Sequence, residues 1–198
     1  MLGFFKKTKE IIREVNRETR YALKITTPHN EAEVRGAMQI IQADFDINLK
    51  HDMSIGLNHF NIITMKDDLN INILCIGEAT DKNVYDVYHV VTNNHQNTKV
   101  NIIFKAVARD SSKIVYRSDL VCGVGASGTG AQTAKFILDS TEAEIDVVPA
   151  LDINSKEMPT THAASIGGVD KSLVWYSAIH GLDKISAKDM IIDGFLNK

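Results

Sequence analysis

The stretch from Ile71 to Val100, INILCIGEATDKNVYDVYHVVTNNHQNTKV, decides the fold. Two runs of mainly β-branched, aromatic and other apolar residues are each followed by a small polar cluster, ATDKN near residue 81 and NNHQN near residue 95. In the first run, Ile71, Ile73 and Cys75 point to one face of a strand, and the residues between them point to the other. The pattern predicts two short strands separated by turns, with Cys75 facing inward as a small hydrophobic residue rather than a reactive thiol.

The same pattern of apolar runs followed by small polar clusters recurs from about residue 45 to about residue 165. Successive polar clusters lie about 14 or 15 residues apart, and short runs of Val, Ile and Phe fill the intervals. Regular short strands of this kind suit a sandwich, a barrel or a β-solenoid in which each turn buries its inner face on the next. The residues alone leave these three alternatives open. The clusters are KDD near 67, ATDKN near 81, NNHQN near 95, RDSS near 110, GASGTG near 128, DST near 140 and NSK near 155.

Helical patterns flank the strand-rich region. Apolar residues recur at spacings of three to four over residues 4–23, which predicts an amphipathic helix whose stripe faces a core or a partner rather than a membrane surface. Residues 30–45 suit either a second short helix or an early strand. After residue 168 the period is helical again, and Asp170 is the expected N-cap of a first helix that Gly181 closes in the left-handed conformation. Ser186 and Asp189 resemble a capping box for a last helix, so the chain is expected to end in a helical hairpin.

Composition excludes several classes of function. The chain has 198 residues, 44% of them hydrophobic, and a formal net charge of -3 without a block of five or six like charges, so nothing indicates a nucleic-acid partner. The apolar runs are too short to cross a membrane, and no signal peptide is recognisable, so we expect a cytoplasmic protein. The two cysteines are far apart and form no CxxC motif, which argues against a disulfide framework or a structural zinc site.

Few residues carry the signature of a reactive site. The glycine-rich segment from Gly123 to Gly130 lacks the Lys-Ser/Thr pair of a phosphate loop and is typical of a long flexible turn between strands. His89 and His95 are expected to have structural roles, on a strand and in the turn after it. His162 lies between small residues in EMPTTHAASIGG, where a neutral imidazole could bind iron or zinc. The residues alone favour a structural role for His162 as well.

The C-terminal half resembles a known family. The order of Pro149, ALDI, THAASIGGVDKSLVWYSAIHGL and AKDMIIDGF is similar to the C-terminal part of the SufB/SufD family, which are scaffold proteins of iron-sulfur cluster assembly. The resemblance covers about residues 85–197. The matching residues are Pro149, Leu151, Asp152, Ile153, His162, Ala164, Ser165, Ile166, Gly167, Leu173, Val174, Trp175, Tyr176, His180, Gly181, Leu182 and Phe195.

The resemblance implies a fold and a set of partners. We expect a mainly β protein, a right-handed parallel β-helix (β-solenoid), with an N-terminal helical segment over residues 1–45, a core over 46–168 and a helical hairpin over 169–198. The resemblance also implies a scaffold rather than an enzyme, and a dimer formed through the last turns with an identical chain or a SufB-like chain. The hairpin is expected to dock a SufC-type ABC ATPase. Its candidate contact residues are Trp175, Tyr176, Met190, Ile191 and Phe195.

The resemblance also points to a cluster site with departures from the family pattern. It implies that His162 is a ligand for a transient iron-sulfur cluster at the dimer interface, and Cys122 is the one thiol in the matching region that could join it. The position of the essential SufB cysteine is held by Ala134, and Thr161 and Ala163 replace the acidic residues that flank the histidine. The chain is therefore more similar to SufD, in shortened form. The alternatives are a metal-free interaction protein of the same fold, and a β-helix carbohydrate-active enzyme, for which no cluster of acids is visible.

Overall fold

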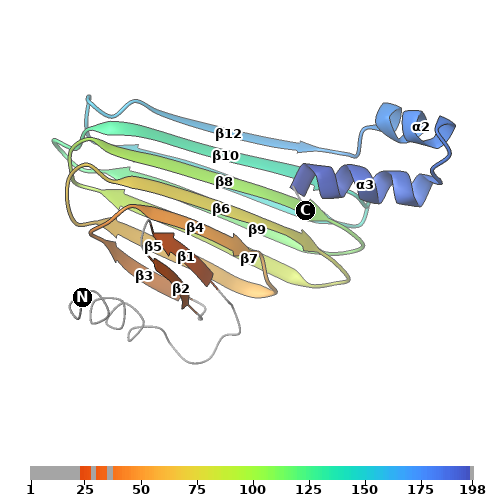
Figure 1. The fold of residues 1–198 in the computed structure, drawn as a ribbon, viewed down its shortest axis with the longest axis horizontal. Coiled ribbons are helices and arrows are strands. Elements are labelled where there is room, and N and C mark those ends of the chain that lie inside the picture. Colours follow the sequence, from red (N-terminus) through yellow and green to blue (C-terminus); the bar gives the residue numbers. More distant parts are fainter. Residues whose placement is uncertain (1–22, 28–29, 35–37, 197–198) are drawn as a thin grey trace.

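A computed structural model describes residues 23–27, 30–34 and 38–196 of the chain. These residues form strands β1 to β12 and helices α2 and α3, drawn in Figure 1. The strands are β1 (Leu23–Thr27), β2 (Asn30–Val34), β3 (Met38–Ala43), β4 (Ile47–Asp52), β5 (Gly56–Thr64), β6 (Asn70–Ala79), β7 (Val84–Asn93), β8 (Thr98–Ala108), β9 (Lys113–Cys122), β10 (Gly128–Leu138), β11 (Glu144–Ile153) and β12 (Thr160–Gly167), followed by α2 (Lys171–Ile179) and α3 (Lys184–Leu196).

The strands form two sheets, and from β3 onward successive strands alternate between them. One sheet has the order β12-β10-β8-β6-β4-β1-β2, and the other has the order β11-β9-β7-β5-β3. All pairs from β3 to β12 are parallel, while β1 pairs antiparallel with both β2 and β4. The chain therefore winds around one core, and Figure 1 shows the stacked strands of the resulting β-solenoid. The expected fold class is confirmed, and a sandwich or barrel of hairpins is excluded because neighbouring strands are one full turn apart in sequence.

The pairing register explains the spacing of the polar clusters. Val84 pairs with Lys113 on the next turn of the solenoid, and Lys113 pairs with Glu144 on the turn after that. Each full turn contains two strands and two corners, so the corners recur at half the length of a turn, as the sequence predicts. Several corners have an Asp or Asn at positive φ, a conformation that these side chains tolerate better than most. They are Asp68, Asp81, Asn97 and Asp110, with φ between 52° and 60°.

Alternating side chains from both sheets fill the interior. Ile71, Ile73 and Cys75 of β6 are buried, as the alternation predicts. The buried residues form two apolar clusters, one containing Ile73, Ile102 and Leu120 and the other built around the stacked rings of Phe104 and Tyr116, whose centroids are 4.3 Å apart. Between the two clusters lies a layer of buried polar side chains: His89 on β7, Ser118 on β9 and Gln132 on β10.

The N-terminal boundary differs from the one expected at residue 46. β3 already belongs to the second sheet and pairs in parallel with β5, so the solenoid begins before that boundary. The segment over residues 30–45, which suits a helix or a strand by its sequence, contains β2 and β3. Leu23, expected at the end of the first helix, is the first residue of β1. The rest of that helix, residues 4–22, lies outside the described residues.

The glycine-rich segment is only partly a turn. The expected turn between strands is confirmed over residues 123–127, but it is shorter than expected because Gly128 and Gly130 belong to β10. Gly128 has φ of 133°, and a Cβ atom added there would lie 1.9 Å from the carbonyl oxygen of Thr98 on the turn beneath. The glycine therefore serves the close stacking of neighbouring turns rather than phosphate binding.

The C-terminal hairpin has the expected helices with one different cap. The Asp170 side chain accepts a hydrogen bond from the Ser172 amide at 2.8 Å, and Gly181 has φ of 94°, so both predicted ends of α2 are confirmed. The capping box at Ser186 is wrong, because α3 begins two residues earlier. Its cap is Asp183, whose carboxylate accepts from the amides of Ile185 and Ser186 at 2.9 and 3.0 Å.

Helix α3 packs on the outer face of the first sheet. Ile192 and Leu196 of the helix are buried against Val107 of β8 and Ile137 of β10. Beside this contact Arg109 lies 3.0 Å from Asp189 of the helix, and it also approaches Glu78 and Asp139. Lys188 pairs with Asp139 at 2.6 Å. Within the described part of the chain, no helix is both long and apolar enough to cross a membrane.

Candidate functional site

The solenoid ends in a turn that nothing covers among the described residues. β11 and β12 are the last strands of the two sheets, and each pairs on one side only. The inward side chains of β11, such as Val147 and Leu151, are only partly buried, and β12 is exposed from Thr161 to Gly167. This open end therefore presents two strand edges and an apolar inner surface to its surroundings.

His162 lies in this open end. It is exposed on β12 and pairs in register with Gln132 of β10. Register partners on neighbouring parallel strands point to the same side, and Gln132 points inward, so His162 belongs to the inner face of the last turn. Gln132 is 2% exposed, and its Nε2 donates to the carbonyl oxygen of Ala150 on β11 at 3.3 Å. Its Oε1 has no hydrogen-bond partner among the described residues.

The residues around His162 offer few further metal ligands. Ala134, at the position of the essential SufB cysteine, is buried on the same inner face and pairs with Ala164, so two methyl groups lie where a thiolate would be needed. Thr161 and Ala163 are exposed neighbours of His162 without a carboxylate. Among the described residues, no group of three or more His, Cys, Asp or Glu side chains is placed to hold a metal ion.

Cys122 is part of the core rather than of the exposed end. It is the last residue of β9, fully buried, and its Sγ lies 3.2 Å from the Sδ of Met158. Burial, with a smaller contribution from Asp152, raises the pKa of the Cys122 thiol to about 11. The thiol is therefore protonated near neutral pH, and only the thiolate is a good metal ligand. Cys122 is thus enclosed in the core, whereas His162 is exposed.

His89 and His95, the two histidines expected to have structural roles, contact other side chains of the solenoid. His89 is fully buried between the rings of Phe60 and Tyr116, with ring centroids 5.7 and 5.8 Å away. His95 lies in a corner, where its Nδ1 is 3.2 Å from Asp67 Oδ1. These positions agree with the structural roles that the sequence indicates.

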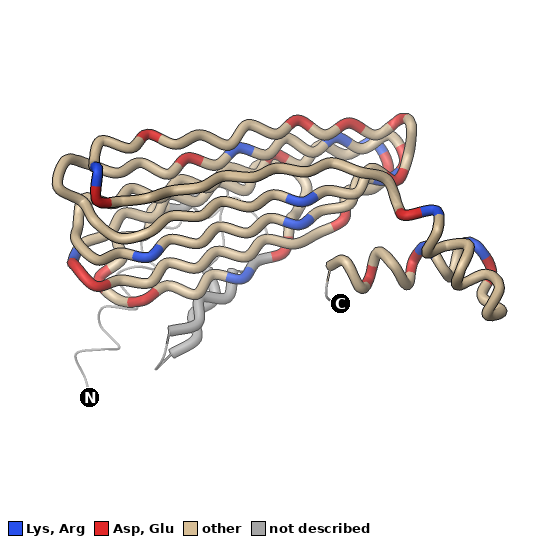
Figure 2. Tube along the Cα trace, turned by 90° about the horizontal axis from the view of Figure 1, so that it is seen from above, with Lys and Arg blue, Asp and Glu red and all other residues tan. Residues whose placement is uncertain are grey.

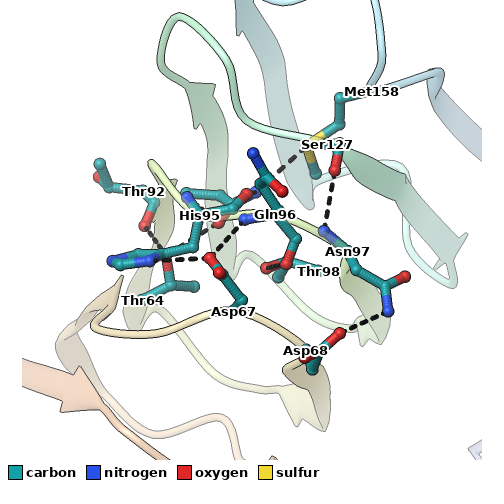
Figure 3. A network of polar contacts seen from close by, with 11 residues as sticks. Thr64, Asp67, Asp68, Thr92, His95, Gln96, Asn97, Thr98, Ser127 and Met158 are labelled. Carbon is teal, nitrogen blue, oxygen red and sulfur yellow. Dashed lines mark hydrogen bonds and ion pairs between the residues drawn. The ribbon is translucent and has the colours of Figure 1, made fainter.

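The corner of His95 belongs to a ladder of polar contacts between turns, shown in Figure 3. Asp67 accepts from the Gln96 amide of the next turn at 2.9 Å, and Asp68 accepts from the Asn97 side chain at 2.6 Å. The Asn97 amide in turn donates to Ser127 Oγ, one turn further on, at 2.9 Å. The ladder joins the corners of successive turns, so we assign it a structural role.

The helical hairpin exposes large apolar side chains. Trp175 and Tyr176 of α2 are 66% and 58% exposed, and Met190 of α3 is also exposed. Ile191 is partly buried, and Phe195 packs against the solenoid, where the Lys105 ammonium lies 5.9 Å from its ring centre. Of the five candidate contact residues, Trp175, Tyr176 and Met190 are thus exposed to solvent, and Ile191 is partly buried. Phe195 anchors α3 to the solenoid.

Sequence reasoning missed two features of these sites. Gln132 has no motif, and only the length of one solenoid turn, counted back along the chain from His162, could have located it beneath the histidine. On the hairpin, further exposed apolar residues adjoin the predicted contacts, and the sequence has no signal that separates them from a buried stripe. They are Leu173, Ile179, Leu182 and Ile185.

Charge has no comparable concentration on one face. Figure 2 shows acidic and basic residues interspersed over the strands, the corners and the hairpin. This distribution agrees with the small net charge and differs from the basic stripe typical of nucleic-acid binders.

Comparison with known proteins gives one consistent result. A family model described as "SUF system FeS cluster assembly, SufBD core domain" matches residues 13–195. The chain is 25% identical over 144 residues to an iron-sulfur cluster assembly SufBD family protein of Staphylococcus saprophyticus. The matched residues are 72% of this chain and 31% of the relative. A relative with the same description from Methanocaldococcus jannaschii is 28% identical over 134 residues, 68% of this chain and 42% of its own length. A relative with the same description from Synechocystis is 22% identical over 151 residues, which are 76% of this chain and 33% of the relative.

Proposed function

Since the chain belongs to the SufBD family of the SUF iron-sulfur cluster assembly system, we propose that it is a scaffold component of that assembly and acts by binding rather than by catalysis. The chain spans about a third of the length of two of these relatives and 42% of the third, so the role is proposed for the core that it contains. The observation that carries the proposal is the open end of the solenoid, which presents His162 on an uncovered inner face. The proposed place of action is the cytoplasm.

The open end is the proposed dimer interface. β11 and β12 offer unpaired strand edges, and the partly buried residues Val147, Leu151 and Ile153 offer an apolar surface that a partner would cover. The partner is a second copy of the chain or a longer SufB-like chain. In a symmetric dimer each contact is repeated, and an axis that passes close to His162 would bring the two His162 side chains together across the interface.

The exposed face of the hairpin is the proposed docking surface for a SufC-type ABC ATPase. Trp175, Tyr176 and Met190 are large apolar side chains in solvent, and aromatic residues of this kind are frequent anchors of protein interfaces. Ile191 contributes at the edge of this surface. Phe195 acts indirectly, because its contact with the solenoid holds α3 in place.

The proposed cargo is a transient iron-sulfur species bound by His162. At the open end the described residues supply one imidazole, that of His162, so a partner chain and the sulfides of the cargo must complete the coordination of iron. A second candidate function is a metal-free interaction protein that binds the ATPase or a SufB-like partner. It is favoured by Ala134 in the place of the SufB cysteine and by the burial of Cys122.

The experiment that tests the assembly role is co-expression with the SufC-type ATPase of the same organism, followed by affinity capture and size-exclusion chromatography. The parent chain is expected to retain the ATPase, and the variant Trp175→Ser/Tyr176→Ser is expected to lose it. Thr133→Val on the outer face of β10 is a control that should retain it. A folded parent chain that captures no ATPase would overturn the docking proposal.

The cluster proposal is tested by anaerobic reconstitution with Fe²⁺ and sulfide. The parent chain is expected to retain iron and sulfide through gel filtration, and His162→Ala is expected to lose most of both. If neither protein retains iron although both are folded and dimeric, the metal-free function is the correct one.

A further inference from the structure

Gln132 is a polar residue that packing of the interior does not explain. It is buried on β10 between the inward positions of Gly130 and Ala134, where an apolar side chain would fill the space without a polar group. Buried polar atoms in folded proteins almost always have partners, and an amide oxygen that lacks one destabilises the fold. The Oε1 atom of Gln132 lacks one within the described chain, which suggests a role for this oxygen.

The orientation of the Gln132 amide is fixed by the second sheet. Its Nε2 donates to the Ala150 carbonyl oxygen on β11, and the opposite assignment of the amide would place two oxygens together. The Oε1 atom is therefore the end of the amide that is left to accept a hydrogen bond. The register places His162 directly beside Gln132 on the inner face, and neighbouring strands are only about 4.8 Å apart.

We propose that Gln132 is the positioning residue of His162. Its Oε1 accepts the N–H of the neutral imidazole, which fixes one tautomer and one ring orientation. The second ring nitrogen, with its lone pair, is then presented out of the open end toward iron. Metal-binding histidines commonly have such an acceptor behind them, and its loss typically weakens metal binding. The inference rests on the proposed ligand role of His162. It adds the residue that fixes the direction in which the lone pair of His162 points.

The alternative donor for Gln132 is the hydroxyl of Ser118, in the same polar layer. Ser118 Oγ is also buried, and it pairs in register with Pro149 of β11 rather than with a residue of β12. Ser118→Ala therefore removes a buried hydroxyl of the same layer without altering the neighbours of His162 on β10 and β12. It is the matched control for a change at Gln132.

The test is the tautomer of His162, measured by long-range ¹H–¹⁵N correlation of the imidazole in the full chain at about pH 8, where ordinary imidazoles are neutral. His162→Ala identifies the signal. The parent chain and Ser118→Ala are expected to show one tautomer. Gln132→Met, which keeps the side-chain length but removes the acceptor, is expected to show a mixture. Gln132→Glu, which restores an oxygen acceptor, is expected to return a single tautomer.

Iron binding gives the second measurement. Anaerobic Fe²⁺ titration is expected to show about tenfold weaker binding for Gln132→Met than for the parent chain and for Ser118→Ala. An unchanged tautomer in Gln132→Met overturns the inference, whatever the iron affinity. A tautomer mixture in Gln132→Met combined with full iron binding by His162→Ala supports the positioning contact and overturns the ligand role of His162 instead.

Discussion

The interior turns and the last turn of the solenoid have the same alternation of side chains but different burial. On β7, every second residue from Tyr85 to Asn93 is buried, and its neighbours are partly exposed. On β11 the same alternation runs from Glu144 to Ile153, but the inward residues are only partly buried and the outward ones are exposed. The inner face of β11 thus has the composition of a core strand, but the part of the chain that the structure describes has no further turn to cover it. An alternating pattern therefore encodes a face that needs a cover, and the cover need not come from the same chain.

The largest expected contrast between the two regions is in stability. Phe104→Ala in the interior removes a ring that contacts Tyr116 and Phe136, so the free energy of unfolding should fall by about 3–5 kcal/mol. Ile166→Ala on β12, where the side chain is half exposed, should change it by less than about 1 kcal/mol in the monomer. Urea denaturation at low protein concentration measures both. Similar losses for the two variants would mean that the last turn is covered in solution.

The reactivity of thiols should separate the same two regions. Cys122, with its pKa raised from 9.0 to about 11, should have about a hundredfold less thiolate near neutral pH than an ordinary cysteine, and burial slows its alkylation further. A cysteine introduced by Ala163→Cys on the exposed β12 should react at the rate of a free thiol. Timed labelling with iodoacetamide and mass spectrometry measures both sites. Rapid labelling of Cys122 in the native protein would contradict the closed interior and reopen its role beside His162.

A smaller effect is expected where the hairpin joins the solenoid. Arg109→Met removes the cation beside Asp189 and leaves Asp139 with Lys188 alone, so we expect a loss of about 1–2 kcal/mol and faster proteolysis after Gly167. Lys99→Met at the exposed start of β8 is a control that should leave proteolysis unchanged. Equal protection of the hairpin in both variants would show that the apolar contact of α3 is sufficient to hold it.

The smallest effect concerns the caps of the hairpin. Hydrogen bonds from Ser172 to Asp170 and from Ser186 to Asp183 lower the pKa of each carboxyl group from its ordinary value of 3.8. Because the folded pKa values are lowered, this stabilisation is present above about pH 4 and is lost as the pH falls through the lower folded values. Amide exchange of α2 should therefore rise below about pH 4 relative to Asp170→Asn/Asp183→Asn, after correction for intrinsic exchange. Parallel pH profiles of the parent and the double variant would contradict this assignment of the caps.

The sequence predicts the strands of this fold better than their assembly. Alternation such as that of Ile71, Ile73 and Cys75 is a local property, and the corner residues Asp81 and Asn97 favour turns by their own conformational preferences. The choice between barrel, sandwich and solenoid depends on which strands pair, and that is a property of residues a full turn apart along the chain. The early strand β3 is not separated from a helix by its sequence, because its short run, MQIIQA, is polar near both ends.

The same limit applies to the candidate site, where local features can be predicted from the sequence but contacts between turns cannot. His162 is singled out by its small neighbours and by the resemblance, but its relation to Gln132 depends on register and becomes visible only in the folded chain. The exposure of Trp175 and the partial burial of Phe195 against the solenoid cannot be predicted either, because an apolar residue on a helix has the same sequence signature whether it faces a core or a partner. The prediction for Ser186 is wrong because its own helix begins before it.

One full turn of the solenoid, such as the interval from Val84 to its register partner Lys113, is the unit in which a molecule of this architecture changes its length. Loss of a single residue from a strand would turn the later inward side chains of that strand outward. Loss of one complete turn instead brings two surviving turns into register with the same corners aligned. Evolution can therefore shorten or extend such a protein turn by turn while the open end and the hairpin keep their structures.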